Sequence, residues 1–222
     1  MSSKAGINGL GETAFVTDKT PLILIQSNAV RLSSFTTDPT AEAIPGLRTY
    51  SLALDQNPII VKALTSFVGW LLGDLIAQVF IVGGPIDYNR LATLSFFGLI
   101  YHGPSGHYFY NWLDGIIPGT EAVPVLSKVF VDQLFWCPIF MSVFFVYLGL
   151  VNGDSLHTIG MKVKKDLFSA CLGSWKVWPM AHLINFKFVP NKWRIPYINA
   201  VQIAFNTFLS LIGHKEISDI SI

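Results

Sequence analysis

Three long stretches of this chain contain no Asp, Glu, Lys or Arg, and each is long enough to cross a lipid bilayer as a helix. They run from Leu91 to Leu113, from Gln133 to Gly153 and from Ile195 to Gly213. A bilayer core about 30 Å thick is spanned by about 20 apolar residues in a helix. Because only helices and closed barrels satisfy their backbone polar groups in lipid, these stretches predict membrane helices.

Two further stretches are apolar but interrupted by charge. One runs from Ile59 to Val82 and contains Lys62 and Asp74, and the other runs from Leu167 to Phe188 and contains Lys176, with Lys187 at its end. We therefore expect an all-α fold, a polytopic membrane bundle of four to five hydrophobic helices. The composition agrees, because only 13% of the 222 residues are charged, against about 25% in soluble domains.

The two ends of the chain differ from this apolar middle. Residues 1–47 are rich in Ser, Thr, Gly and Ala and carry both acids and bases. That mixture is typical of neither a secretory signal nor a mitochondrial transit peptide. We expect a disordered N-terminal tail over 1–47, an integral membrane helical domain over 48–215 and a C-terminal tail over 216–222.

Asp74 and Gln78 lie one helical turn apart inside an apolar stretch. A carboxylate in a membrane helix costs about 3 kcal/mol on insertion scales, so it usually faces the inside of a bundle. Two interpretations remain open for this pair. The two side chains line a water path, or they lock helices together through a hydrogen bond or an ion pair with a base on another helix.

A second polar group stands at the entry to a charge-free stretch and consists of Lys128, Asp132 and Gln133. Lys128 and Asp132 are four residues apart, so they share a helical face and can form a local ion pair. The alternative is that this face binds an anionic or amphiphilic solute. All five side chains are therefore candidates for pore lining or helix locking.

No sequence motif supports a reaction. The chain has no Gly-x-Ser-x-Gly elbow and no phosphate-binding Gly-rich loop. His102 and His107 are five residues apart, which does not place two histidines on one metal. We expect no enzyme activity, no catalytic residue, no cofactor and no metal site. A net charge of +1 gives no reason to expect a nucleic-acid partner.

From about residue 50 to residue 211, the chain resembles the eukaryotic family that contains the twenty-two-kilodalton peroxisomal membrane protein and the Mpv-type protein of the mitochondrial inner membrane. The resemblance rests on an ordered series of short motifs. The series is Tyr50, Asn57-Pro58, Gly73-Asp74, Gln78, Asp87, Arg90, Gly103-Pro104, His107, Tyr110, Lys128, Asp132-Gln133, Pro138, Trp175, Trp178-Pro179, Asn185-Phe186, Val189-Pro190, Arg194, Asn206 and Leu209-Ser210.

The segment from Trp175 to Pro190 carries the densest part of this signature. Its two proline dipeptides, Trp178-Pro179 and Val189-Pro190, predict bends that bracket Asn185. His182 stands where the family usually has Gln, which adds a titratable group, so His182 is a sixth candidate for pore lining or helix locking. We expect this segment to shape and anchor the bundle, and we expect a conducting path to depend more on Asp74 and Asp132.

The resemblance implies a small helical bundle in an organellar membrane. The function it favours is a channel or pore component that passes small solutes and supports organelle homeostasis. The alternative is a non-conducting structural membrane protein or a subunit of a larger membrane complex. The expected partners are the lipid bilayer and a second copy or a membrane complex. The expected location is the mitochondrial inner membrane first, the peroxisomal membrane second and a plastid membrane third.

Overall fold

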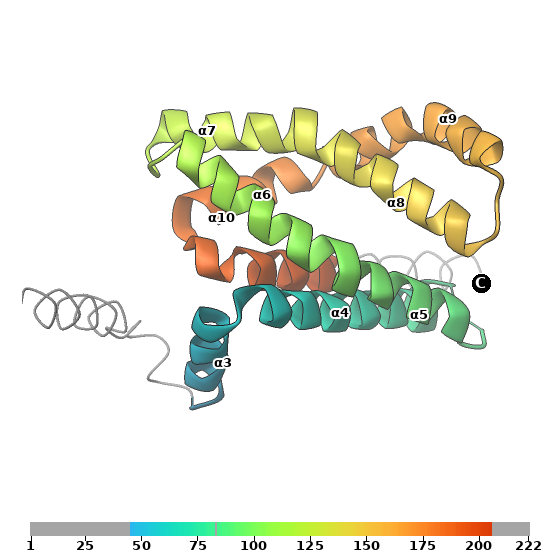
Figure 1. Cartoon of the computed structure of the whole chain (residues 1–222), viewed down its shortest axis with the longest axis horizontal. Helices are drawn as coiled ribbons and strands as arrows, with labels where there is room; N and C mark the ends of the chain where they lie inside the picture. Colours follow the sequence, from blue (N-terminus) through green and yellow to red (C-terminus); the bar gives the residue numbers. More distant parts are fainter. Residues whose placement is uncertain (1–44, 83, 206–222) are drawn as a thin grey trace, which may run out of the picture. The chain divides into compact units, whose positions relative to one another are not determined.

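The computed structural model describes residues 45–82 and 84–205, and within those ranges every regular element is a helix (Figure 1). The expected all-α class is thereby confirmed for this part of the chain. The chain divides into two units, Met1–Arg48 and Thr49–Ile222, and the helical bundle belongs to the second. Most of the expected N-terminal tail, the C-terminal tail and the signature residues Asn206 and Leu209-Ser210 lie outside the described residues.

A short helix, α3 (Pro45–Gln56), precedes the first long helix, which comprises α4 (Pro58–Ala77) and a π-helical turn, η1 (Gln78–Val82). The break between α3 and α4 falls at Asn57, whose φ of −138° is not helical. Pro58 begins α4 because a proline at the first helical position loses no helical hydrogen bond. The predicted helix from Ile59 to Val82 is confirmed.

The second long helix joins α5 (Tyr88–Phe97), the π-turn η2 (Gly98–His102) and α6 (Gly103–Ile116). It begins where the Asp87 carboxylate accepts a hydrogen bond of 3.0 Å from the backbone N–H of Arg90, an N-terminal cap. The helix contains the whole charge-free stretch from Leu91 to Leu113, so the prediction of a helix there is correct.

The third long helix has the same construction, with α7 (Ala122–Val131), η3 (Asp132–Trp136) and α8 (Cys137–Val151). A proline closely follows each of the π-turns η2 and η3: Pro104 follows η2, and Pro138 follows η3. Proline has no N–H and its ring displaces the carbonyl four residues earlier. The N–H of the residue before it reaches back five residues instead, from Cys137 to the carbonyl of Asp132 and from Gly103 to that of Gly98.

The predicted single helix from Leu167 to Phe188 is wrong. α9 (Leu156–Ser174) ends just before Trp175, the first residue of the signature segment. α10 (Trp178–Phe188) begins after a three-residue turn. Pro179 sits in the first turn of α10, where proline is tolerated, and it cannot continue α9. The predicted bends at both proline dipeptides are confirmed. The chain turns at residues 175–177 just before Trp178-Pro179, and its backbone is extended at Val189 before η4 (Asn191–Trp193).

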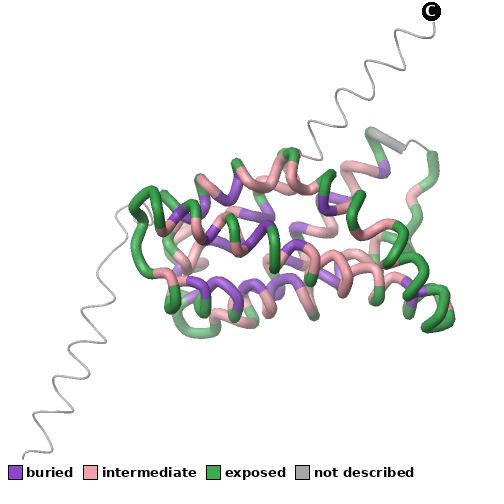
Figure 2. The backbone as a smooth tube through the Cα atoms, turned by 90° about the horizontal axis from the view of Figure 1, so that it is seen from above, coloured by how far each residue is buried: buried purple, intermediate pink, exposed green. Residues whose placement is uncertain are grey.

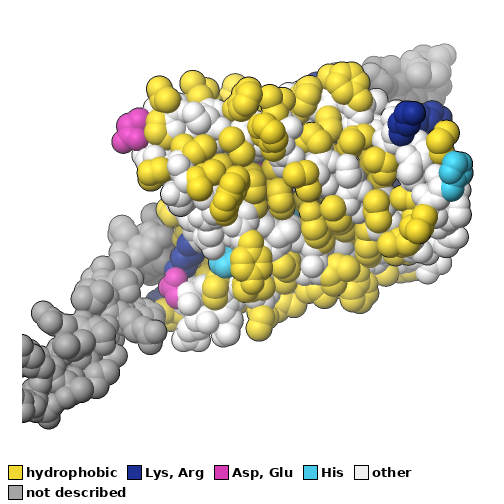
Figure 3. Space-filling view, turned by 45° about the horizontal axis from the view of Figure 1, so that its top comes forward, with side chains coloured by type: hydrophobic (Ala, Val, Ile, Leu, Met, Phe, Trp, Pro, Cys, Tyr) yellow, Lys and Arg dark blue, Asp and Glu magenta, His cyan; other side chains and the backbone are white. Residues whose placement is uncertain are grey.

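Residues 194–205 are helical as well, so the described half of the last predicted span is a helix. Among residues 45–82 and 84–205, two helices are long and apolar enough to cross a membrane by length and composition, Pro58–Phe80 and Ala122–Val151. Large apolar side chains remain exposed along both of them, and the space-filling view shows an extensive hydrophobic surface (Figure 3). Such a surface suits contact with lipid.

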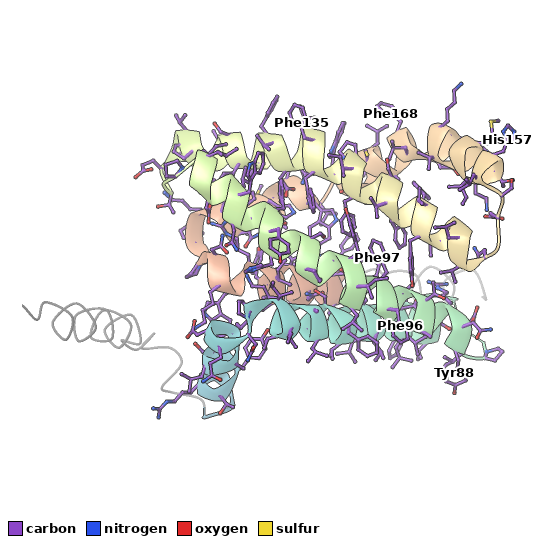
Figure 4. All side chains as sticks on the ribbon, in the orientation of Figure 1. Tyr88, Phe96, Phe97, Phe135, His157 and Phe168 are labelled. Atoms are coloured by element: carbon purple, nitrogen blue, oxygen red, sulfur yellow. The ribbon has the colours of Figure 1, made fainter. Side chains whose placement is uncertain are left out.

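Buried positions recur along each helix on the side that faces its neighbours (Figure 2). α4 packs against α5, η2 and α6, α8 packs against α9, and α10 packs against α7. Phe96 and Phe97 illustrate the division (Figure 4). Phe97 is fully buried, with its ring centroid 5.0 Å from that of Phe144, whereas Phe96 is half exposed and lies at the edge of the α4 surface, where its ring centroid is 5.8 Å from that of Phe67.

Gly103 brings α6 very close to α4. A Cβ atom added there would lie 2.6 Å from the Cα of Ala63 and 2.6 Å from the carbonyl oxygen of Lys62. Both neighbours are backbone atoms of α4, so the helices would have to separate to admit any side chain. Gly103, predicted from the resemblance as a structural residue, therefore sets the distance between two long helices.

Candidate functional site

A cavity of about 280 Å³ lies among the long helices, α10 and residues 194–205. Its walls combine aromatic rings, among them those of Trp70, Trp136 and Trp178, with polar groups. The polar side chains that line it include His102, Tyr110, Asp132, Gln133, Ser174 and His182. Three of the sequence candidates, Asp132, Gln133 and His182, thus meet in one place.

Asp132 is the centre of this polar cluster, and only 2% of it is exposed. Its Oδ2 lies 3.3 Å from Nε2 of His182 and accepts a hydrogen bond of 2.6 Å from Nε2 of Gln133. Tyr110 lines the same cavity. Within the described part of the chain no Lys or Arg pairs with Asp132, so its negative charge is held mainly by polar groups and one histidine.

The π-turns η2 and η3 place these side chains. Asp132 and Gln133 are the first two residues of η3, and His102 is the last residue of η2. A π-turn widens the helix locally, so consecutive residues such as Asp132 and Gln133 can both face the interior. His102 is held in turn by a contact of 3.0 Å between its Nδ1 and the Ser66 hydroxyl, which also accepts from the side-chain amide of Asn199 at 3.1 Å.

The signature segment from Trp175 onward forms part of the cavity wall. Trp175 donates its indole N–H to the backbone carbonyl of Gln133 at 3.0 Å, which ties the turn before α10 to η3. Trp178 and Phe186 lie against the His182 ring, at centroid distances of 5.6 Å each. These contacts fit the expectation that the segment shapes and anchors the bundle, and the segment also supplies the candidate His182, together with Trp178, to the cavity wall.

Lys128 does not pair with Asp132, so the predicted local ion pair is wrong. Its ammonium lies 2.8 Å from Oδ1 of Asp114 at the end of α6, and it donates to the carbonyl of Gly119 at 2.9 Å. Arg194 reaches the other oxygen of Asp114 at 2.8 Å, and Asn191 donates to that oxygen at 2.7 Å. One carboxylate therefore holds together α6, α7 and the segment after α10.

Asp114 is the first residue after the charge-free stretch that ends at Leu113. Partial burial acts to raise the pKa of its carboxyl, but the hydrogen bonds from Asn191, Lys128 and Arg194 outweigh burial and lower that pKa below its ordinary value. The charged form is thus the one that the structure stabilises. Lys128 and Arg194 are themselves almost completely buried.

Asp74 and Gln78 form a third polar group, away from the cavity lining. Oδ1 of Asp74 lies 2.9 Å from Nη2 of Arg90, and Gln78 donates to Oδ2 of Asp74 at 2.7 Å. Gln78 also exchanges hydrogen bonds with the backbone of Asp87, at 3.1 and 2.6 Å. Of the two interpretations left open by the sequence, this geometry favours the helix lock, because α4 is tied to the start of α5.

The remaining signature residues have structural positions. His107 lies 3.2 Å from the ammonium of Lys62, and the Phe186 ring is fully buried under the Arg194 guanidinium, 5.0 Å from its centroid. Asn185 is fully buried in α10, while Val189 and Pro190 end that helix.

Sequence reasoning missed Tyr110 and His102 as members of the site. By sequence, Tyr110 is interpretable as part of an aromatic belt at the membrane interface with Tyr108 and Trp112. In the structure Tyr108 and Trp112 are exposed, but Tyr110 is buried and lies in the hydrophobic core. The available signal is the spacing, because His102 and Tyr110 are eight residues apart and share a helical face.

Comparison with known proteins agrees with the predicted resemblance. A model of the Mpv17 / PMP22 family matches residues 149–210. The mitochondrial inner membrane protein Mpv17 of Rattus norvegicus is 32% identical over 171 residues, covering 76% of this chain and 97% of that protein. PXMP2/4 family protein 2 of Dictyostelium discoideum is 32% identical over 169 residues, covering 72% of this chain and 86% of that protein.

Peroxisomal membrane protein 2 of Bos taurus is 26% identical over 180 residues, which cover 75% of this chain and 89% of that protein. No solved structure matches the chain. The relatives are thus named for the mitochondrial inner membrane and the peroxisomal membrane, the two locations that the sequence favours first. With relatives above 30% identity matched over most of their length, the chain belongs to the Mpv17/PMP22 family.

Proposed function

We propose that this chain forms a passage for small solutes across an organellar membrane and so supports the homeostasis of that organelle. The observation that carries the proposal is the polar cavity around Asp132, Gln133 and His182. Helices with so much exposed apolar surface surround a space lined by a carboxylate, two imidazoles, two amides and hydroxyls. In membrane proteins ionisable groups inside a bundle commonly mark solute or ion pathways.

The size of the cavity limits what it holds at one time. At about 30 Å³ for each water molecule, 280 Å³ corresponds to roughly nine waters or one small metabolite of similar volume. The aromatic walls offer contacts to apolar parts of a solute, and the polar groups offer both hydrogen-bond donors and acceptors. We propose that the three long helices, together with the α9–α10 segment and the helix that begins at residue 194, cross the membrane around this space.

For location we propose the mitochondrial inner membrane, with the peroxisomal membrane second, because relatives over most of the chain carry those two names. Imaging of the full-length chain with a small tag, beside markers for both organelles, tests this. Exclusive labelling of a third membrane contradicts the proposal.

The test of the passage is solute flux through the purified full-length chain. We expect reconstituted liposomes to release small solutes and planar bilayers to show conductance, whereas empty membranes do not. Asp132→Asn keeps the size of the side chain and removes the charge in the cavity, so conductance or ion preference should change several-fold.

The matched control is Asp74→Asn, which removes an equally buried charge outside the cavity lining. We expect this variant to conduct like the natural chain once reconstituted. A correctly folded natural chain that is silent contradicts the passage, and so does an equal change of conductance in both variants.

The ion pairs favour a second candidate, a non-conducting protein that organises the membrane or joins a larger membrane complex. Asp74 with Arg90, and Asp114 with Lys128 and Arg194, tie helices together through buried charges. Under this alternative Asp132 and His182 form one more lock. Asp132→Asn then lowers the melting temperature in detergent and leaves flux at the background level of empty liposomes.

A further inference from the structure

One face of α9 is exposed and combines basic with apolar side chains. His157, Met161, Lys164, Phe168 and Leu172 follow one another at spacings of three or four residues, which places them on one side of a helix. All five are exposed, and Phe168 is 68% exposed. His157 and Phe168 point away from the bundle (Figure 4). We call this set, together with Lys165, the outer α9 face.

The opposite side of α9 is fixed to the bundle. Ile159 is buried, and a Cβ atom added to Gly149 of α8 would lie 2.5 Å from its side chain. Cys171, three turns later, is buried as well. α9 is therefore a packed helix rather than a free segment, and its outer face is held in a defined direction.

The charges of the outer α9 face are not used inside the protein. Lys162 pairs with Asp154 at 2.6 Å, but across residues 45–82 and 84–205 neither Lys164 nor Lys165 forms an ion pair. Both lysines are exposed. Two adjacent ammonium groups beside Met161 and Phe168 leave a surface that suits a ligand with both negative charge and an apolar part.

The chain order places this face near the end of a membrane helix. Four residues separate the end of the candidate span Ala122–Val151 from Leu156, where α9 begins. Lys164 and Lys165 lie within about 15 Å of the start of α9 along its axis. Long lysine side chains extend from such positions toward the headgroup level while their stems stay against apolar surface. Figure 3 shows basic side chains near a histidine at the right-hand end of the hydrophobic surface, and others at its lower left.

We propose that the outer α9 face binds an anionic phospholipid of the surrounding bilayer. Lys164 and Lys165 hold the phosphate of the headgroup, and Met161, Phe168 and Leu172 lie against the acyl chains. Lysine clusters next to membrane helices attract anionic lipids, at about 1 kcal/mol for each lysine, which is about fivefold in affinity. The inference depends on insertion of α8 in a membrane and is independent of solute passage through the cavity.

Native mass spectrometry of the full-length chain tests lipid preference directly. The chain in detergent is offered phosphatidylglycerol and phosphatidylcholine at equal concentration. We expect phosphatidylglycerol to be retained preferentially, and Lys164→Gln with Lys165→Gln to lower that preference by more than tenfold. Lys176→Gln is the control, because Lys176 is an exposed lysine in the turn after α9 and lies off this face.

A preference that survives in the double variant, or that falls equally in Lys176→Gln, overturns the proposal. Retention of a second protein copy in place of lipid overturns it as well. Circular dichroism establishes that the variants are folded.

A second measurement uses the natural chain alone, so it does not depend on folding of a variant. Acylation of lysines by a water-soluble ester is followed by peptide mass spectrometry in nanodiscs. With phosphatidylglycerol present we expect Lys164 and Lys165 to react several-fold more slowly than in phosphatidylcholine, while Lys176 is unchanged. Equal protection by inorganic phosphate in phosphatidylcholine nanodiscs identifies a free-phosphate site and overturns the lipid proposal, as does the absence of any protection.

Discussion

Two carboxylates in this bundle, Asp114 and Asp132, have opposite surroundings. Asp114 accepts from two cations and an amide at 2.7 to 2.8 Å, so its charge is fully compensated. Asp132 has one histidine at 3.3 Å and one side-chain amide at 2.6 Å, and it faces a cavity. The two acids differ in their partners: a carboxylate between two cations ties helices together, whereas one without a Lys or Arg partner is available to a solute in the cavity.

We expect the two acids to differ most in how much stability the protein loses when each is replaced by Asn. Asp114→Asn leaves Lys128 and Arg194 buried without a carboxylate, which should cost about 3 kcal/mol of unfolding free energy. Asp132→Asn removes one long ion contact and should cost about 1 kcal/mol or less. Unfolding of both purified variants by denaturant in mixed micelles measures the difference. Equal losses would remove the distinction between lock and site.

Gly103→Ala tests the close approach of α6 and α4 on which the cavity wall depends. The added methyl meets the backbone of Ala63 and Lys62, so we expect a loss of about 1 to 3 kcal/mol from overpacking. Gly115→Ala in the same helix is the control, because nothing lies within 4 Å of the added Cβ. That control should be neutral or up to about 1 kcal/mol more stable. Thermal melts in detergent compare the two, and similar melting temperatures contradict the close packing.

Asp74→Asn tests a second ion pair between helices, the one that Asp74 forms with Arg90. Its partner Arg90 is 44% exposed, so water replaces much of the lost ion pair and we expect a loss of only about 1 kcal/mol. The loss should also grow smaller at high salt, since an exposed charge is screened. Denaturant unfolding at low and at high ionic strength measures this. A loss as large as that of Asp114→Asn argues that Arg90 is less hydrated than its exposure indicates.

The smallest effect is a pH dependence that belongs to Asp114 alone. The pKa of its carboxyl is lowered in the folded state, so its contribution to stability is complete above about pH 3.9, the ordinary value for Asp. The contribution is lost as pH falls from there through the lowered pKa. The stability difference between the natural chain and Asp114→Asn should stay constant from pH 7 to about pH 5 and shrink below about pH 4. A difference that already declines at about pH 6 contradicts this assignment.

Much of the fold could be predicted from the sequence, because apolar length is a local property. The helices from Ile59 to Val82 and from Leu91 to Leu113 are present, and the bends at Trp178-Pro179 and Val189-Pro190 occur where proline interrupts hydrogen bonding. The prediction failed from Leu167 to Phe188 because hydropathy alone carries a helix through the turn at residues 175–177. Pro179, just after this turn, is equally compatible with a bend inside one span and with the start of a new helix.

The site was only partly predictable, for a different reason. Asp132, Gln133 and His182 are recognisable as polar groups in apolar surroundings, but their meeting joins η3 to α10 across a long separation in sequence. A spacing of four residues favours pairing of Lys128 with Asp132, since it is a helical neighbour distance. In the folded chain the Asp114 carboxylate, at the end of the preceding helix, makes the better contact.

The sequence by itself determined that this chain is a helical membrane protein of the Mpv17/PMP22 family, since apolar runs and ordered motifs can be recognised without knowing which residues contact one another in the fold. Only the tertiary structure decided which polar groups are paired and which line a cavity. The physical reason is that the pairing of a buried charge depends on the nearest opposite charge in space. Helix crossings set by small residues such as Gly103, and π-turns set by Pro104 and Pro138, determine that distance.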